Sequence, residues 1–439
     1  MRRLWATLGA AVLLVGCDRA LDIDPTTAVD FDKAIVDARS ARAALHGVYD
    51  ALQSGSLYSR DHVVYPELYA DNLTFTGTFQ TDREVALRSI QPSNGAILGM
   101  WTASYNGINR ANLLLEALPT VPGLTDAERA QMRGEALFVR ALHYFNLVRY
   151  WGGVPLVLQG TRGVADAERA KLPRARDTEV YARIEADLQE AVNLLPDARL
   201  PGRATRGAAQ ALLAKVYLEQ GKWSQARDAA AAVIASGRYQ IVPNYRDLFA
   251  TKNSAESIFE LQYSPNDTNN HAFWLFPVAL GGRRGYAPST SLFNAYEAGD
   301  QRRDATIARD AQGRLYGIKY FRIATNDDNV IVLRLAEMYL IRAEANARLG
   351  QFAQARDDIN EIRKRAGLGR IDCADLTGCL QAVIQERRVE FAIEGHRFFD
   401  LRRAGLAEQV LGIPAFRLLW PIPLYEIERN PNLTQNPGY

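Results

Sequence analysis

Apolar side chains recur three and four positions apart over most of the chain, which is the spacing of amphipathic helices. Clear examples are FDKAIVDARSARAALHGVYDAL at 31–52, EALFVRALHYFNLVRYW at 135–151 and EVYARIEADLQEAVNLLP at 179–196. Gly152 and Gly153 end the second of these segments, and Pro196 ends the third. The pattern predicts a mostly α-helical protein.

One short phrase occurs twice: GKWSQARD at 221–228 returns as GQFAQARD at 350–357, with five of the eight positions identical. Apolar helical segments flank both copies, so each copy predicts an antiparallel helix pair that turns at a glycine, with Trp223 or Phe352 packed at the turn. This arrangement is typical of a tetratricopeptide-like repeat. The copies stand more than a hundred residues apart. A long insertion therefore interrupts the repeat scaffold, and insertions on rigid scaffolds often carry binding sites.

These patterns divide the chain after residue 16 into one domain with several parts. Helical scaffold is expected at about 30–60, 100–240 and 330–405, an inserted loop-rich region at about 241–330, and an extended, proline-rich tail at 412–439. The segment ERRVEFAIEGHRFFDLRRAG is predicted as one helix. Its charges favour an ion-pair lattice over acid–base chemistry because acids and arginines alternate. They are Glu386, Arg388, Glu390, Glu394, Arg397 and Asp400.

The first residues, MRRLWATLGAAVLLVGC, have two arginines, a short apolar run and small residues before Cys17. This is typical of a lipoprotein signal peptide over 1–16, with Cys17 as the acylated first residue of the mature chain. An ordinary secretory signal with a chance cysteine is the alternative. Loss of Arg2 and Arg3 would take the net charge from +2 to about zero. No other segment is apolar enough to cross a bilayer, so we expect a protein anchored to a membrane.

The remaining composition excludes several function classes. The sequence has no stripe of basic residues of the kind that binds nucleic acid. Cys373 and Cys379 lie in IDCADLTGC and predict a local disulfide in an exported protein. The five histidines show no metal-ligand spacing, so we expect no metal and no other cofactor. GxSxG, HExxH and P-loop motifs are absent, and we predict that the protein is not an enzyme. A hydrolase remains a distant alternative, because carboxylate pairs for glycoside cleavage are defined only in three dimensions.

Several segments together resemble the successive blocks of the SusD/RagB family of outer-membrane lipoproteins: GEALFVRALHYFNLVRYWGGVPL, RLAEMYLIRAEA, DINEIRKRAGL, ERRVEFAIEGHRFFDLRR and LWPIPLYEIERNPNLTQNPGY. The early LDIDPTTA is similar too. The resemblance implies a tetratricopeptide-containing helical platform with an irregular, loop-rich binding face. It also implies a cell-surface protein that binds glycans, or in some members peptides, as a lid on a SusC-like TonB-dependent transporter.

Two departures accompany this resemblance. The chain is shorter than many members, which would trim surface loops. Arg19 and Ala20 follow Asp18 where surface-exported members often carry an acidic signal, so the side of the membrane that the protein faces stays open. A tetratricopeptide-type periplasmic adaptor lipoprotein in envelope assembly is the second hypothesis.

Sugars are bound by aromatic faces together with amide, carboxylate or guanidinium groups at their hydroxyl edges. Two segments outside the helix pairs offer this mixture: YADNLTFTGTFQTDRE at 69–84 and YSPNDTNNHAFWLFPVALGGRRGY at 263–286. Some of the clustered aromatics could instead belong to the core, as we expect for Trp101. The candidate ligand-binding residues are Tyr69, Asp71, Asn72, Phe75, Phe79, Arg83, Asn269, Asn270, His271, Phe273, Trp274, Arg283 and Tyr286. The sequence does not identify the glycan or peptide.

Overall fold

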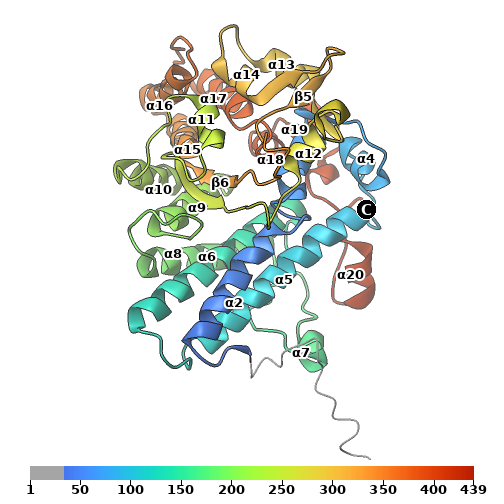
Figure 1. The fold of residues 1–439 in the computed structure, drawn as a ribbon, viewed down its shortest axis with the longest axis vertical. Coiled ribbons are helices and arrows are strands. Elements are labelled where there is room, and N and C mark those ends of the chain that lie inside the picture. Colours follow the sequence, from blue (N-terminus) through green and yellow to red (C-terminus); the bar gives the residue numbers. More distant parts are fainter. Residues whose placement is uncertain (1–33) are drawn as a thin grey trace, which may run out of the picture.

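The computed structural model describes residues 34–439, and this part of the chain is mostly helical, as predicted (Figure 1). Long helices pack in succession: α5 against α6, α6 against α8, α8 against α9, and α9 against α10. Most of the C-terminal half of α6 is buried, which places this helix at the centre of the scaffold. The bounds are α5 Gly95–Ala117, α6 Asp126–Trp151, α8 Asp177–Leu194, α9 Arg206–Glu219 and α10 Trp223–Ala235.

The two repeat phrases form two helix pairs, α9 with α10 and α15 (Leu335–Arg348) with α16 (Phe352–Arg365). Gly221 and Gly350 adopt φ of 69° and 75° at the two turns, a left-handed conformation that favours glycine. Trp223 is partly buried against the main core. Helix α10 also packs directly on α15, so the two pairs stack as neighbours although a long insertion separates them in the sequence.

The insertion folds into short helices and strands that take part in three two-stranded antiparallel sheets, β1 with β3, β2 with β6, and β4 with β5. Strand β1 lies outside the insertion, near the start of the described chain. Because β6 leads directly into α15, the β2–β6 pair returns the chain to the scaffold. The strands are β1 Leu73–Phe75, β2 Ser257–Leu261, β3 Tyr286–Pro288, β4 Ile307–Arg309, β5 Leu315–Gly317 and β6 Val330–Arg334. The helices of the insertion are α11 Tyr245–Ala250, α12 His271–Leu275, η2 Val278–Leu280, α13 Thr290–Ala295 and α14 Gln301–Thr306.

Shorter helices complete the two ends and one long connection of the described chain. Near the start lie α2 Ala38–Asp50, η1 Ala51–Gln53, α3 Asp61–Tyr69 and α4 Gln80–Ala86, and α7 Val164–Arg169 follows α6. Near the end lie α17 Leu376–Glu390, α18 Arg397–Arg403, α19 Ala407–Leu411, η3 Ala415–Leu418 and α20 Leu424–Arg429. Apart from η3 and α20, the proline-rich tail contains no regular helix or strand.

The prediction of one continuous helix through ERRVEFAIEGHRFFDLRR is wrong, because α17 ends at Glu390 and α18 begins at Arg397. Between them Ile393 and Gly395 adopt φ of 64° and 81°, which a continuous helix does not allow. The buried carboxylate of Glu67, on α3, accepts the backbone N–H groups of Ile393 at 3.2 Å and Gly395 at 3.0 Å. A distant acid therefore stabilises the break, which helical periodicity alone does not reveal.

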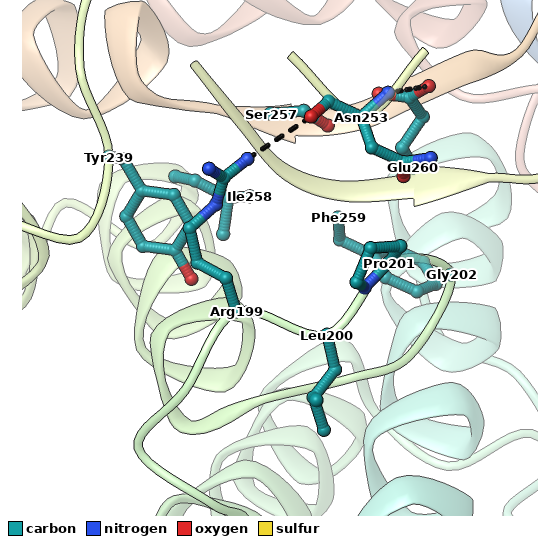
Figure 2. Close-up of a pocket in the computed structure, with 10 residues that line it drawn as sticks. All are labelled: Arg199, Leu200, Pro201, Gly202, Tyr239, Asn253, Ser257, Ile258, Phe259 and Glu260. Atoms are coloured by element: carbon teal, nitrogen blue, oxygen red, sulfur yellow. Dashed lines mark hydrogen bonds between the residues drawn. The ribbon is translucent and has the colours of Figure 1, made fainter. Parts of the chain in front are cut away.

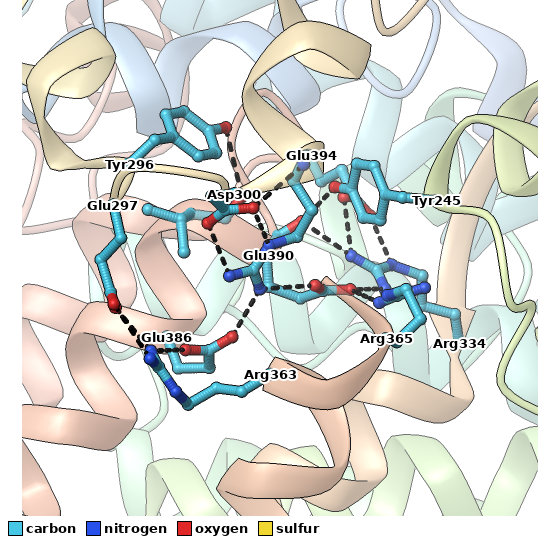
Figure 3. A network of polar contacts seen from close by, with 12 residues as sticks. Tyr245, Tyr296, Glu297, Asp300, Arg334, Arg363, Arg365, Glu386, Glu390 and Glu394 are labelled. Carbon is cyan, nitrogen blue, oxygen red and sulfur yellow. Dashed lines mark hydrogen bonds and ion pairs between the residues drawn. The ribbon is translucent and has the colours of Figure 1, made fainter. Parts of the chain in front are cut away.

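The charges of this segment form buried ion pairs, as expected, but most of their partners come from other elements (Figure 3). Glu390 lies at the centre, 2.5 Å from a nitrogen of Arg334 and 3.0 Å from one of Arg302, and it also pairs with Arg365. Arg302 comes from α14 of the insertion and Arg365 from α16 of the second repeat. The network therefore links the insertion to the scaffold through side chains that are nearly inaccessible to solvent.

Two further sequence predictions concern the anchor and the cysteines. Cys17 and the signal peptide lie outside the described residues, and no helix between residues 34 and 439 is long and apolar enough to span a membrane. Cys373 and Cys379 are joined by a disulfide. They pack with Ala347 and Ala355, at the turn of the second repeat.

Candidate functional site

The two loop segments with sugar-binding composition meet in the structure. Strands β1 and β3 pair with Leu73 opposite Pro288 and Phe75 opposite Tyr286. The N–H of Thr76 donates to the carbonyl of Gly285 at 2.9 Å and continues the contact beyond the strands. As a result α4, which follows the first loop, and α12, which lies in the second, come together on one side of the molecule (Figure 1).

Three aromatic residues, Phe79, Phe273 and Trp274, form what we call the aromatic cluster. The Trp274 ring centroid lies 6.1 Å from that of Phe79 and 5.5 Å from that of Phe273, both in edge-to-face geometry. Phe79 is 44% exposed, and the other two are partly buried. A Cβ on Gly285 would stand 2.8 Å from the Trp274 ring, so glycine at this position lets the backbone support the indole.

Two arginines lie against the aromatic cluster. The guanidinium carbon of Arg283 is 4.8 Å from the Phe79 ring centroid and 5.2 Å from that of Trp274, and the carbon of Arg60 is 5.3 Å from Trp274. Arg283 is among the residues that the sequence predicts, whereas Arg60 is not. Arg60 immediately precedes α3, within YSRD, and nothing in its local sequence distinguishes it from other arginines.

Buried acids support the cluster from beneath. Asp82 accepts hydrogen bonds from the hydroxyl groups of Tyr286 at 2.5 Å and Tyr65 at 3.0 Å. Asp61 accepts from Nε of Arg60 at 2.5 Å. Burial raises the pKa of Asp61 to about 6, although the adjacent Arg60 opposes that shift. Both carboxylates are inaccessible to solvent, so they hold the site together and do not face a ligand.

Five predicted contact residues are buried and have partners inside the protein: Tyr69, Asn72, Asn269, His271 and Tyr286. The Tyr69 hydroxyl donates to the carbonyl of Arg417 at 2.8 Å, and the Asn72 amide donates to Glu67 at 2.7 Å. The imidazole of His271 bonds the carbonyl of Tyr58 at 2.8 Å. The structure corrects their expected role, because each side chain is buried and hydrogen-bonded within the fold and leaves no surface for a ligand.

The other candidates divide into supporting and accessible residues. Asp71 forms ion pairs with Arg397 at 2.7 Å and Arg388 at 2.9 Å. Asn269, the fifth buried candidate, donates to the carbonyl of Asp328. Phe75 packs against Tyr286, with 5.9 Å between their ring centroids. Arg83 and Asn270 are exposed, and Arg83 lies one helical turn beyond Phe79. Of the thirteen predicted residues, the accessible ones near the cluster are Phe79, Arg83, Asn270, Phe273, Trp274 and Arg283.

Two surface pockets lie elsewhere in the molecule. One of about 270 Å³ is bounded by residues 199–202, Tyr239 and β2 (Figure 2). The Arg199 guanidinium at this cavity already donates to the carbonyl of Ser254 at 2.6 Å. Another of about 300 Å³ lies between α5, α7 and α20. Neither contains the aromatic cluster. In the part of the chain that the structure describes, no group of three or more His, Cys, Asp or Glu side chains could hold a metal ion.

Comparison with known proteins relates the chain to two family models. Residues 21–218 match the family described as starch-binding associating with outer membrane. Residues 319–416 match the SusD family. The matches include nearly all of α9 and the whole of the second helix pair. The stretch between them, residues 219–318, contains α10, most of the insertion and two of the three residues of the aromatic cluster.

The similar proteins align with between 73% and 97% of this chain. SusD-like protein P2 of Formosa agariphila is 29% identical, over 97% of this chain and 97% of its own. The starch-binding protein SusD of Bacteroides thetaiotaomicron is 26% identical, over 73% and 75%. The solved structure of a laminarin-binding SusD-like protein superimposes with a TM-score of 0.82 at 28% identity, over 92% of this chain and 100% of that one.

Proposed function

Because the chain belongs to the SusD/RagB family, we propose that it captures glycans at the outer membrane and delivers them to a partner transporter. The family description and the names of its relatives support this function: one relative binds starch and another binds laminarin. In this proposal the protein is a binding protein and not an enzyme, and its partner is a SusC-like TonB-dependent transporter. Acylation at Cys17 would anchor it in the outer membrane, with the binding face toward the cell exterior.

The aromatic cluster is the observation that supports this proposal most. Phe79, Phe273 and Trp274 come from two distant loops, and at least Phe79 presents a large apolar surface to solvent. Tyr286 packs beside Trp274, with 5.8 Å between their ring centroids, and donates a hydrogen bond to the buried Asp82, while Gly285 lets the backbone lie close beneath the indole. Such preformed aromatic surfaces bind sugar rings by their apolar faces, and preorganisation reduces the entropy lost on binding.

A polysaccharide-binding screen with matched variants tests the proposed function. The soluble protein lacking residues 1–17 would be applied to an array of neutral and acidic glycans, alongside Phe79→Ala and Leu87→Ala. Leu87 is the matched control, since it is a 64% exposed apolar residue at the end of the same helix, α4. We expect Phe79→Ala to weaken binding at least several-fold while Leu87→Ala binds as the wild type does. Failure of the wild type to bind any glycan, or equal losses in the two variants, would contradict the proposal.

Delivery requires a second test in cells. A weak site suffices for uptake if the protein holds the ligand over a transporter, because local concentration then replaces affinity. Deletion of the partner transporter should therefore abolish uptake of the glycan and leave surface binding measurable. Normal uptake in the absence of any such transporter would instead favour the periplasmic adaptor hypothesis.

A further inference from the structure

We propose that the ligand of the aromatic cluster is an acidic glycan whose carboxylate or sulfate groups bind Arg283, so that Arg283 determines specificity. This inference rests on the proposed function and adds to it the charge class of the ligand. It is drawn from three features of the site: the free guanidinium of Arg283, the burial of the nearby acids, and the position of Arg283 over the aromatic rings.

The Arg283 guanidinium has no partner of opposite charge among the described residues. It is exposed, and within residues 34–439 its side chain forms neither a hydrogen bond nor an ion pair, so its contacts are with the Phe79 and Trp274 rings. Its backbone is fixed, because its N–H donates to the carbonyl of Phe273 at 2.6 Å. The site therefore holds a positioned cation whose hydrogen-bond donors are all available to a ligand.

The acids near the cluster cannot neutralise this charge at the surface. Asp82 is buried and bonded to two tyrosines, and Asp61 is buried and paired with Arg60. Arg83, on the same face of α4 as Phe79, is a second exposed arginine without an ion pair among the described residues. Glu84, also on α4, is half-buried and accepts hydrogen bonds from Gln80, Gln91 and Asn94, so the exposed charges of the site are those of Arg83 and Arg283, whereas the whole protein is nearly neutral at +2.

The placement of Arg283 also distinguishes between ligands. Its guanidinium stacks on Phe79 and Trp274, where it covers part of the aromatic surface that a sugar ring would use. Any sugar that stacks on these rings must move the guanidinium aside, and the hydroxyl groups of a neutral sugar then accept single N–H bonds from it without a counter-charge. An acidic sugar can stack on the rings while its anionic group accepts two parallel N–H bonds from the guanidinium, which are the stronger kind of hydrogen bond.

Binding of three oligosaccharides of equal length tests the proposal: a neutral cello-oligosaccharide, an oligogalacturonate, and a carrageenan oligosaccharide whose only charged groups are sulfates. The last two separate the carboxylate source of the charge from the sulfate source. We expect at least one acidic probe to bind more tightly than the neutral probe. Its affinity should fall several-fold between about 0.05 and 0.5 M NaCl, because added salt shortens the Debye length, from about 10 Å at 0.1 M to about 3 Å at 1 M, and so weakens interactions between exposed charges. The neutral probe should show no such dependence.

Substitutions then assign the effect to one residue. Arg283→Gln should lower the affinity for the acidic probe about ten-fold, since hydrogen bonds to charged groups are of that strength, and should not weaken the neutral probe. Arg283→Lys should give an intermediate affinity, because lysine keeps the positive charge but lacks the two parallel N–H donors of the guanidinium. Arg309→Gln is the matched control: Arg309 is exposed, stacks on Phe293 at 4.6 Å and donates to a backbone carbonyl, and its contacts do not include the cluster. It should leave both affinities unchanged.

The outcomes separate failure of this inference from failure of the proposed function. If a neutral oligosaccharide binds at least as tightly as both acidic probes, and Trp274→Ala abolishes that binding, the glycan-binding function stands and the charge specificity is refuted. Equal losses in Arg283→Gln and Arg309→Gln would also refute it, because they would indicate a general effect of charge. If no oligosaccharide of either kind binds, both proposals are contradicted.

Discussion

Substitution of Glu390 by glutamine would remove the central charge of the buried network and little else (Figure 3). Glutamine has nearly the same shape and keeps one carbonyl acceptor. In the wild type, burial opposes ionisation of Glu390, but Arg365, Arg334 and Arg302 outweigh it and hold the pKa of the carboxyl well below its usual range. The substitution would therefore leave three buried guanidinium groups short of one counter-charge.

The expected magnitude follows from the depth of burial. All four side chains are at most 2% exposed, so water cannot replace the lost carboxylate. Removal of one member of a buried ion pair typically costs about 3–5 kcal/mol. The entropy of unfolding is about 2.1 cal/mol/K per residue, so each kcal/mol lowers the melting temperature of a chain of this size by roughly 1 °C. We expect a decrease of about 3–5 °C.

Thermal melting and urea unfolding of Glu390→Gln, followed by circular dichroism, would measure this effect. Glu408→Gln is the control, since Glu408 is exposed on α19 and its substitution should change the melting temperature by less than about 1 °C. The network links the insertion to the scaffold, so the variant should also expose the insertion to proteolysis earlier than the helix pairs. A Glu390→Gln protein as stable as the Glu408→Gln control would refute the view that the network joins the two parts.

Three further predictions concern pH, the disulfide and the anchor. Burial holds the pKa of His62, His143, His271 and His396 below the usual range, so the unfolded chain takes up protons that the folded chain does not. The free energy of unfolding should therefore fall as the pH drops from about 6.5 toward 5, by about 1.4 kcal/mol per pH unit for each histidine. Melting temperatures that stay flat over this range would contradict the prediction. Asp61, whose pKa is raised to about 6, contributes in the opposite direction, since its share of stability is lost as pH rises from about 4 to 6. Cys373→Ser with Cys379→Ser should cost about 2 kcal/mol and leave the helix pairs folded, as urea unfolding would measure, and a cost near zero would mean that the bridge does not constrain the unfolded chain. Cys17→Ala should release the protein from the membrane fraction, and retention equal to wild type would exclude lipid anchoring.

Helical periodicity and the repeated phrase predicted the scaffold because both depend on local sequence. The helices α9, α10, α15 and α16 begin and end close to where Gly221 and Gly350 indicate. The direct packing of α10 on α15 does not follow from the phrase, since the length of the insertion gives no information about where its ends meet. The break between α17 and α18 depends on Glu67, more than three hundred residues earlier, so no local pattern reveals it.

The candidate site was predicted at the level of segments and less well at the level of residues. Aromatic and polar composition identified both loops, and the β1–β3 pairing brings them together. Composition does not distinguish an exposed aromatic residue from a buried one. Tyr286 and His271 have the same sequence signature as Phe79 and Trp274, yet they are buried, because their polar groups find partners in distant elements. Arg60 was missed for the converse reason, since only the fold brings it to Trp274.

Calorimetric titration and thermal melting of Trp274→Ala, on one protein sample, test most directly whether the aromatic cluster is a glycan-binding surface. Trp274 contacts Phe79, Phe273 and both arginines, and it is partly and not fully buried. We expect affinity for a bound oligosaccharide to fall at least several-fold, since a stacked aromatic contributes about 1 kcal/mol or more beyond its buried area. The melting temperature should change little. Unchanged affinity together with the loss of about 3–5 kcal/mol of stability that is typical of a core tryptophan would contradict the account.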